Sequence, residues 1–233
     1  MSRADSGLRV HFLAGSYAAG HQDSLVTRVK RAKEADLRLL GLASYPRTLD
    51  VFFVDSRTQM DTLVGAPVTG FAQMDSAAVF LVTNPGWRAF ERHEIMHVLA
   101  VAAWGRPTPP GAWIQEGLAQ FADGWCGGSR VDAVVAGLVR EGGEIPFDNV
   151  FRRFRQLDDL TAYLEAASLV GFVTRRWGMS TVERIWQEGS ARLPTIVGQS
   201  VDSLQTEWRN SLPPDRQIPP PARLAEIRKK GCG

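Results

Sequence analysis

Two histidines and a glutamate in the run His93-Glu94-Ile95-Met96-His97 have the residue types and the spacing for metal chemistry. The surrounding residues 87–104 mix apolar and charged side chains in a pattern that predicts a helix. Residues four apart lie on one face of a helix, one turn above each other, so both imidazoles can bind one ion. Glu94 lies about 100° around the helix from His93, which suits it better as a base than as a ligand. Because zinc accepts imidazole and carboxylate ligands, the run predicts a Zn2+ site.

A third ligand is expected from a second segment of the chain. Residues 98–115, eighteen in all, separate His97 from Glu116. The stretch from Gly105 to Gly111 is rich in glycine and proline, and it cannot continue a helix. We therefore expect the chain to turn back and a second helix to begin near Trp113. Glu116, in the first turn of that helix, can then reach the metal from the other side.

The His-Glu-x-x-His run, the gap of eighteen residues and the segment Glu116-Gly117-Leu118-Ala119 together resemble the gluzincin metallopeptidases, and in particular their peptidase MA-like domain family. The resemblance covers residues 49–212 or thereabouts. It implies that His93, His97 and Glu116 are the zinc ligands and that Glu94 is the general base. The expected activity is hydrolysis of peptide bonds by a metal-activated water, with a peptide or protein as the substrate.

Two further residues have predicted roles near the metal. Tyr163 matches the family's tyrosine that stabilises the oxyanion, and the alternative is a tyrosine packed in the core with its hydroxyl bonded elsewhere. Asp123 lies seven residues after Glu116, two turns along the same helix face. Its carboxylate could accept the second ring N–H of His93 and so orient that ligand. The alternative for Asp123 is a solvent-exposed residue at a helix end.

The segment Gly70 to Ser76 departs from the pattern of the aminopeptidase members of the family. Those enzymes carry an acidic residue in this strand that binds a free N-terminus, and this chain has none at the matching place. The departure favours an endopeptidase. The alternative function is a zinc-binding but non-proteolytic scaffold or binding domain of the same fold. The intact Glu94 favours the enzyme.

The order of the expected elements predicts an α+β protein, and the resemblance adds a zincin-like metalloprotease fold. This fold has a small mixed sheet with an active-site helix, followed by a mostly helical C-terminal lobe. The expected parts are residues 1–124, the zincin-like α/β part with the zinc motif; 125–212, the helical lobe; and 213–233, a proline-rich linker and basic tail.

Alternating and β-branched residues predict strands, and apolar residues at helical spacing predict helices. The predicted strands are 8–14, 49–54, 69–74 and 77–83, and the helices that precede the metal helix are 23–42 and 56–63. We expect 69–83 to form a hairpin whose second strand, 77–83, lies at the sheet edge and pairs with an extended peptide. The alternative for 77–83 is an inner strand of the sheet.

Composition excludes several classes of function. The 233 residues are 44% hydrophobic and 22% charged, with a net charge of +2 that gives no reason to expect a nucleic acid partner. No apolar run is long enough to predict a membrane span, and nothing indicates an oligomeric state. The start lacks a signal peptide, which predicts a cytoplasmic protein, or an exported one if a leader is missing. The two cysteines, Cys126 and Cys232, match no metal-ligand spacing and are expected to be free thiols.

Overall fold

The computed structural model describes residues 1–5 and 7–232. The chain is α+β, as predicted, and its contacts divide it into two units, Met1–Ala103 and Trp104–Gly233. This division falls earlier in the chain than the expected boundary after residue 124, because helix α5 (Ala112–Asp123) packs along helix α8 (Asp159–Trp177) of the second unit. Among the described residues, none of the helices has the length and apolar character needed to cross a membrane.

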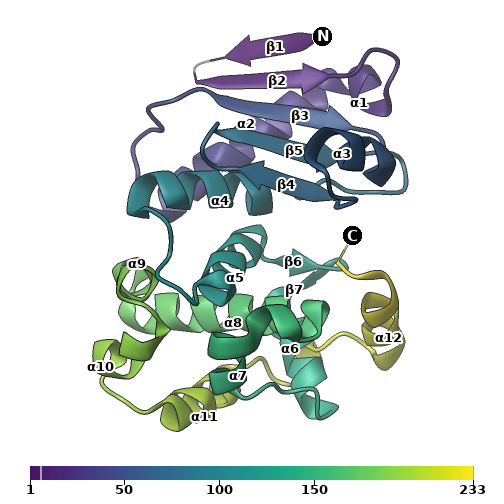
Figure 1. Cartoon of the computed structure of the whole chain (residues 1–233). Coiled ribbons are helices and arrows are strands. Elements are labelled where there is room, and N and C mark those ends of the chain that lie inside the picture. The colour runs from purple at the N-terminus through teal and green to yellow at the C-terminus, as the bar shows by residue number, and fades with distance from the viewer. Residues whose placement is uncertain (6, 233) are drawn as a thin grey trace. The chain divides into compact units, whose positions relative to one another are not determined.

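A mixed sheet is the framework of the first unit (Figure 1). Its strand order is β1-β2-β3-β5-β4, in which β2, β3 and β5 run parallel while β1 and β4 are antiparallel to their neighbours. One face of the middle strands is almost completely buried, as Val10, Val51 and Val79 show. The strands are β1 (Ser2–Asp5), β2 (Leu8–Phe12), β3 (Leu49–Val54), β4 (Gly70–Gln73) and β5 (Ala78–Val82).

The position of β5 corrects one prediction. The antiparallel hairpin of β4 and β5 is confirmed, but β5 lies inside the sheet, between β3 and β4. The expectation that residues 77–83 form the sheet edge was therefore wrong, and β4 is the edge strand instead. The physical reason is visible in β5 itself, because apolar side chains on both faces are typical of a strand that is covered on both faces.

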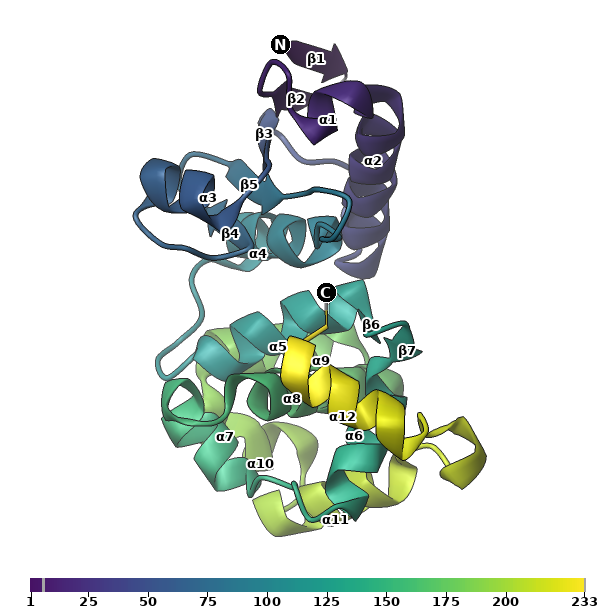
Figure 2. The same cartoon turned by 90° about the vertical axis from the view of Figure 1, so that its right-hand side faces the viewer.

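Helices flank the sheet of the first unit on both sides. Figure 2 shows α2 (Gln22–Leu39) and α3 (Arg57–Val64) on opposite sides of it, and the short α1 (Tyr17–Gly20) precedes α2. Helix α3 begins after Ser56, whose hydroxyl accepts a hydrogen bond from the Gln59 N–H and so caps the helix. Helix α4 (Glu91–Trp104) begins later than predicted, because the backbone of Trp87 is hydrogen-bonded in a turn with Asn84.

Helix α8 is the main support of the second unit. Gly117 lets α5 approach it closely, since a Cβ at residue 117 would lie 2.8 Å from the carbonyl oxygen of Ala166. Buried tryptophans fill the core, and the indole N–H groups of Trp113 and Trp208 donate to the hydroxyls of Ser190 and Ser168. The other helices are α6 (Val131–Arg140), α7 (Phe147–Arg153), α9 (Met179–Glu188), α10 (Leu193–Val197), α11 (Val201–Ser211) and α12 (Pro221–Lys230).

The C-terminal segment packs back onto the second unit. Helix α12 buries Leu224 and Ile227, and Leu224 lies against Gly137 of α6. Cys126 belongs to the short hairpin of β6 (Trp125–Cys126) and β7 (Ser129–Arg130), and it forms a disulfide with Cys232. The expectation of two free thiols was therefore wrong. The cysteines are 106 residues apart in sequence, and it is the packing of α12 that brings them together.

Candidate metal centre

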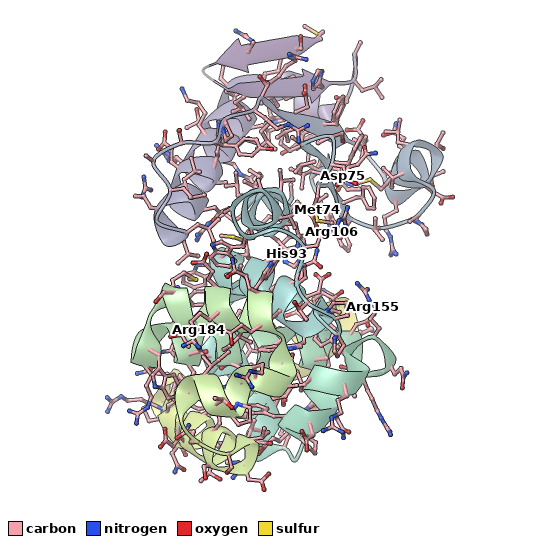
Figure 3. All side chains as sticks on the ribbon, turned by 60° about the vertical axis from the view of Figure 1, so that its left-hand side comes forward. Met74, Asp75, His93, Arg106, Arg155 and Arg184 are labelled. Carbon is pink, nitrogen blue, oxygen red and sulfur yellow. A yellow bond between two sulfur atoms is a disulfide. The ribbon has the colours of Figure 1, made fainter. Side chains whose placement is uncertain are left out.

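His93 and His97 lie on consecutive turns of α4, as their spacing predicted. Their ring centroids are 4.9 Å apart and the ring planes meet at 80°. His97 is buried, with 6% of its surface exposed, and His93 is half-buried. Figure 3 labels His93 on α4, together with Met74 and Asp75 in the turn after β4. The two imidazoles are thus close enough to contribute to one metal site.

Glu94 lies beside the edge strand of the sheet. It is 8% exposed, and its carboxylate lies against the backbone of β4 at Gly70. An ideal Cβ on Gly70 would be only 2.2 Å from Oε1 of Glu94. The carboxylate therefore occupies the space that a side chain at residue 70 would need. This arrangement shields the carboxylate from bulk water and places it against the backbone of β4.

Two ion pairs hold the first turn of α4 against α2. Glu91 pairs with Arg28 at 2.7 Å, and Arg92 pairs with the fully buried Asp36 at 2.8 Å. Burial raises the pKa of the Glu91 carboxyl, and the Arg28 guanidinium opposes that rise. Because Glu91 and Arg92 directly precede His93, the pairs fix the part of α4 from which the histidines project.

The other predicted site residues belong to the second unit. Helix α5 begins at Ala112, next to the predicted start, and Glu116 follows just after its first turn, half-buried. Asp123 ends this helix with 4% of its surface exposed, so the solvent-exposed alternative was wrong. Its role beside His93 stays a prediction.

Tyr163 lies on α8, the helix against which α5 packs. It is half-buried, and its ring centroid is 5.1 Å from that of Phe154. It precedes Ala166 by three residues, close to one helical turn, and Ala166 is where Gly117 makes its close approach. The second unit therefore carries Tyr163 and Glu116 on neighbouring helices, while the first unit carries His93, Glu94 and His97 on α4.

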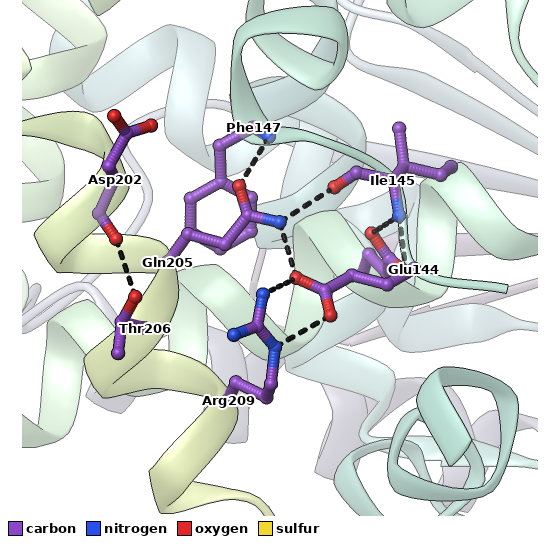
Figure 4. Close-up of polar contacts among 8 residues, drawn as sticks. Glu144, Ile145, Phe147, Asp202, Gln205, Thr206 and Arg209 are labelled. Carbon is purple, nitrogen blue, oxygen red and sulfur yellow. Dashed lines mark hydrogen bonds and ion pairs between the residues drawn. The ribbon is translucent and has the colours of Figure 1, made fainter. Parts of the chain in front are cut away.

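Sequence reasoning missed a polar cluster in the second unit (Figure 4). Glu144 pairs with Arg209 at 2.5 Å, and the hydrogen bond from this guanidinium is the main reason that the pKa of Glu144 is lowered. Gln205 donates to the same carboxylate and accepts from the Phe147 N–H at 2.9 Å. Glu165, which is fully buried, accepts from the backbone near this cluster. A lone acidic residue among the apolar residues of α8 is the sequence signal that could have indicated it.

Comparison with protein-family models and with curated protein sequences finds no match to this chain. The resemblance to the gluzincins therefore rests on the His93–His97 run and on the segment around Glu116. The function has to be inferred from the side chains themselves and from their surroundings in each unit.

Proposed function

We propose that this chain is a zinc-dependent peptidase of the zincin-like fold, and that His93, His97 and Glu116 hold one Zn2+. The observation that carries the proposal is that these three residues form a group that could hold a metal ion. Two imidazoles and one carboxylate are a donor set that catalytic zinc accepts, with the fourth position left for water or substrate. The residues present therefore fit the ion.

The reaction divides into roles for named residues. A bound zinc ion supplies Lewis-acid polarisation of a carbonyl and makes a water molecule acidic near neutral pH. Glu94 accepts a proton from that water while the water oxygen attacks the carbonyl carbon. Glu94 then passes the proton to the leaving amine as the C–N bond breaks. The Tyr163 hydroxyl donates a hydrogen bond to the oxyanion that develops on the carbonyl. The products are two peptide fragments.

The edge strand β4 supports an extended peptide as the substrate. Edge strands offer backbone N–H and C=O groups to which a peptide can add as a further strand. Such pairing uses the main-chain groups of the substrate, which are accessible in an unstructured segment and already hydrogen-bonded in a folded protein. An unstructured peptide is therefore the better substrate. The segment Gly70 to Ser76 has no acidic residue at the place where the aminopeptidases of the family carry one, which supports cleavage inside a chain rather than removal of single N-terminal residues.

The disulfide between Cys126 and Cys232 supports the export alternative to a cytoplasmic location. Disulfides form and persist in oxidising environments, and they are rare where glutathione and thioredoxin keep thiols reduced. We therefore propose that the peptidase acts in an oxidising compartment. Thiol labelling of the protein in its native cells, under non-reducing lysis, tests this point.

The test of the function combines metal analysis with peptide cleavage. After dialysis, the purified protein is expected to hold close to one zinc per chain, and the zinc-loaded protein to cleave inside peptides of an unstructured library. A folded protein that takes up no zinc would overturn the proposal. Zinc binding without cleavage of any peptide would favour the non-proteolytic alternative, and release of single N-terminal residues would contradict an endopeptidase.

A further inference from the structure

Residue 70 is a glycine, although its backbone conformation does not require one. It is the first residue of β4, where it pairs with Leu81 of β5, and its φ lies outside the left-handed region in which glycine is favoured. Glycine inside a strand is usually a cost, because it lacks a side chain that packs and it loses more conformational freedom than other residues on folding. A glycine at such a place often marks the close approach of another group.

The group that approaches is the side chain of Glu94. An ideal Cβ on Gly70 would lie 2.2 Å from Oε1, 2.7 Å from Cδ and 2.9 Å from Cγ of Glu94. All three contacts are shorter than the 3.0 Å below which real Cβ atoms are essentially never found. A methyl group at residue 70 and the present position of the Glu94 carboxylate therefore exclude each other.

The backbones on both sides of this contact are held in place. The pairing of Phe71 with Phe80 fixes β4 on β5, and the pairs of Glu91 with Arg28 and Arg92 with Asp36 fix the start of α4 on α2. All three contacted atoms belong to the Glu94 side chain and none to a backbone, so a methyl group at residue 70 is expected to displace the carboxylate rather than unfold the unit. The displacement needed is on the order of 1 Å, which can cost a reaction about 10²-fold when it affects a catalytic group.

We propose that Gly70 is a positioning residue for Glu94: the missing side chain at residue 70 keeps the carboxylate beneath β4, where it serves as the general base. The role as base rests on the proposed function, whereas the steric contact does not.

A double-mutant cycle on stability tests the contact without any assay of activity. The proteins are the wild type, Gly70→Ala, Glu94→Ala and the double variant, and the midpoint of thermal unfolding is measured for each. Glu94→Ala removes the three atoms that lie nearest to the new methyl group. Gly70→Ala is expected to lower the midpoint by about 2–4 °C or more when Glu94 is present, and not to lower it in the Glu94→Ala background. Equal effects of Gly70→Ala in the two backgrounds would overturn the proposal.

Gly20→Ala is the matched control in the first unit. Nothing lies within 4 Å of a Cβ built at Gly20, and its φ is also outside the left-handed region. Gly20→Ala is expected to keep the wild-type unfolding midpoint. Glu94→Ala should change the midpoint by the same amount in this variant as in the wild type.

Kinetics separate a positioning role from a structural one. In the zinc-loaded protein, Gly70→Ala is expected to lower kcat by about 10-fold to 10²-fold, with KM and zinc content close to wild type. If the stability cycle shows coupling but kcat is unchanged, Gly70 does not position Glu94 for its role as the general base, and that part of the proposal is overturned. A wild-type protein that cleaves no peptide would overturn the proposed function instead, and the stability cycle would still show whether Gly70 makes room for Glu94.

Discussion

Both carboxylate oxygens of Glu165 lie 3.2 Å from the backbone nitrogen of Ile145, which shares its hydrogen between them. Glu165 itself is fully buried on α8. Burial raises the pKa of its carboxyl to about 8, the Ile145 N–H opposes that rise, and the neighbouring Glu144 carboxylate adds to it. The second unit therefore holds an acidic side chain that stays protonated near neutral pH.

The buried Glu165 predicts that stability falls as pH rises from the ordinary pKa of 4.5 to the folded-state pKa of about 8. Its folded-state pKa of about 8 is above the ordinary value of 4.5, so the folded protein binds the proton more tightly than the unfolded chain. The contribution is fully present below the ordinary pKa and is lost as pH rises through the folded-state pKa, at up to about 1.4 kcal/mol per pH unit. Urea unfolding between about pH 5 and pH 9 measures this slope.

Glu165→Gln should flatten that part of the pH profile, because the amide keeps an acceptor for the Ile145 N–H without a titrating proton. The exposed Glu34 provides the matched control, and Glu34→Gln should keep the wild-type slope. An identical slope in the wild type and in Glu165→Gln would show that this carboxyl does not carry the pH dependence.

The disulfide predicts that the C-terminal helix contributes strongly to the stability of the second unit. Cys126 and Cys232 close a loop of 106 residues in sequence, and in the chain-entropy account such a loop stabilises the fold by about 4–5 kcal/mol. Cys232→Ser removes the bond and leaves the buried Cys126 as a small apolar thiol. Its unfolding free energy in urea should fall by a large part of that amount.

Reduction supplies the control for the same bond. A reducing agent should destabilise the wild type and leave Cys232→Ser unchanged. Thiol titration of the denatured, unreduced wild type should find no free thiol. Two reactive thiols in that sample would contradict the disulfide.

Local patterns predicted the elements of the first unit well, because their signals lie within a few residues. Helix α3 lies within one residue of the predicted bounds 56–63, and β3 spans the predicted residues 49–54. Relations between distant segments were predicted wrongly, both for the sheet edge and for the two cysteines. The edge position of β4 depends on which strands pair, and the disulfide of Cys232 depends on where α12 packs.

In the candidate site, too, the local relations were predicted and the relations between distant segments were not. The relation between His93 and His97 follows from helical geometry, and their rings lie on consecutive turns as expected. The place of Glu94 beneath Gly70 requires the sheet edge to pass over α4, which no local pattern encodes. Glu165 was missed for a related reason, since its burial comes from helices that surround α8 rather than from its own neighbours in sequence.

Substitutions are expected to distinguish a zinc ligand from the general base. His97→Ala removes a proposed zinc ligand, so it should lose most of the bound metal and all measurable cleavage. Glu94→Gln keeps the shape of the side chain and the three ligands, so it should hold close to one zinc per chain while kcat falls by about 10²-fold or more. Elemental analysis and peptide cleavage on the same samples measure both effects. Loss of zinc from Glu94→Gln would mean that Glu94 is a ligand rather than the base.

Tyr163 is the residue whose role depends most on its hydroxyl. Its ring packs at 5.1 Å from that of Phe154, a contact that phenylalanine at residue 163 would keep. Tyr163→Phe should therefore retain the fold and the zinc. If the hydroxyl stabilises the oxyanion, kcat should fall by about 10²-fold or more with little change in KM, because the interaction is made in the transition state. Tyr45→Phe is the control, since Tyr45 is a buried tyrosine of the first unit, outside the proposed site. An unchanged kcat in Tyr163→Phe, with zinc still bound, would assign Tyr163 to the packing of α8 alone.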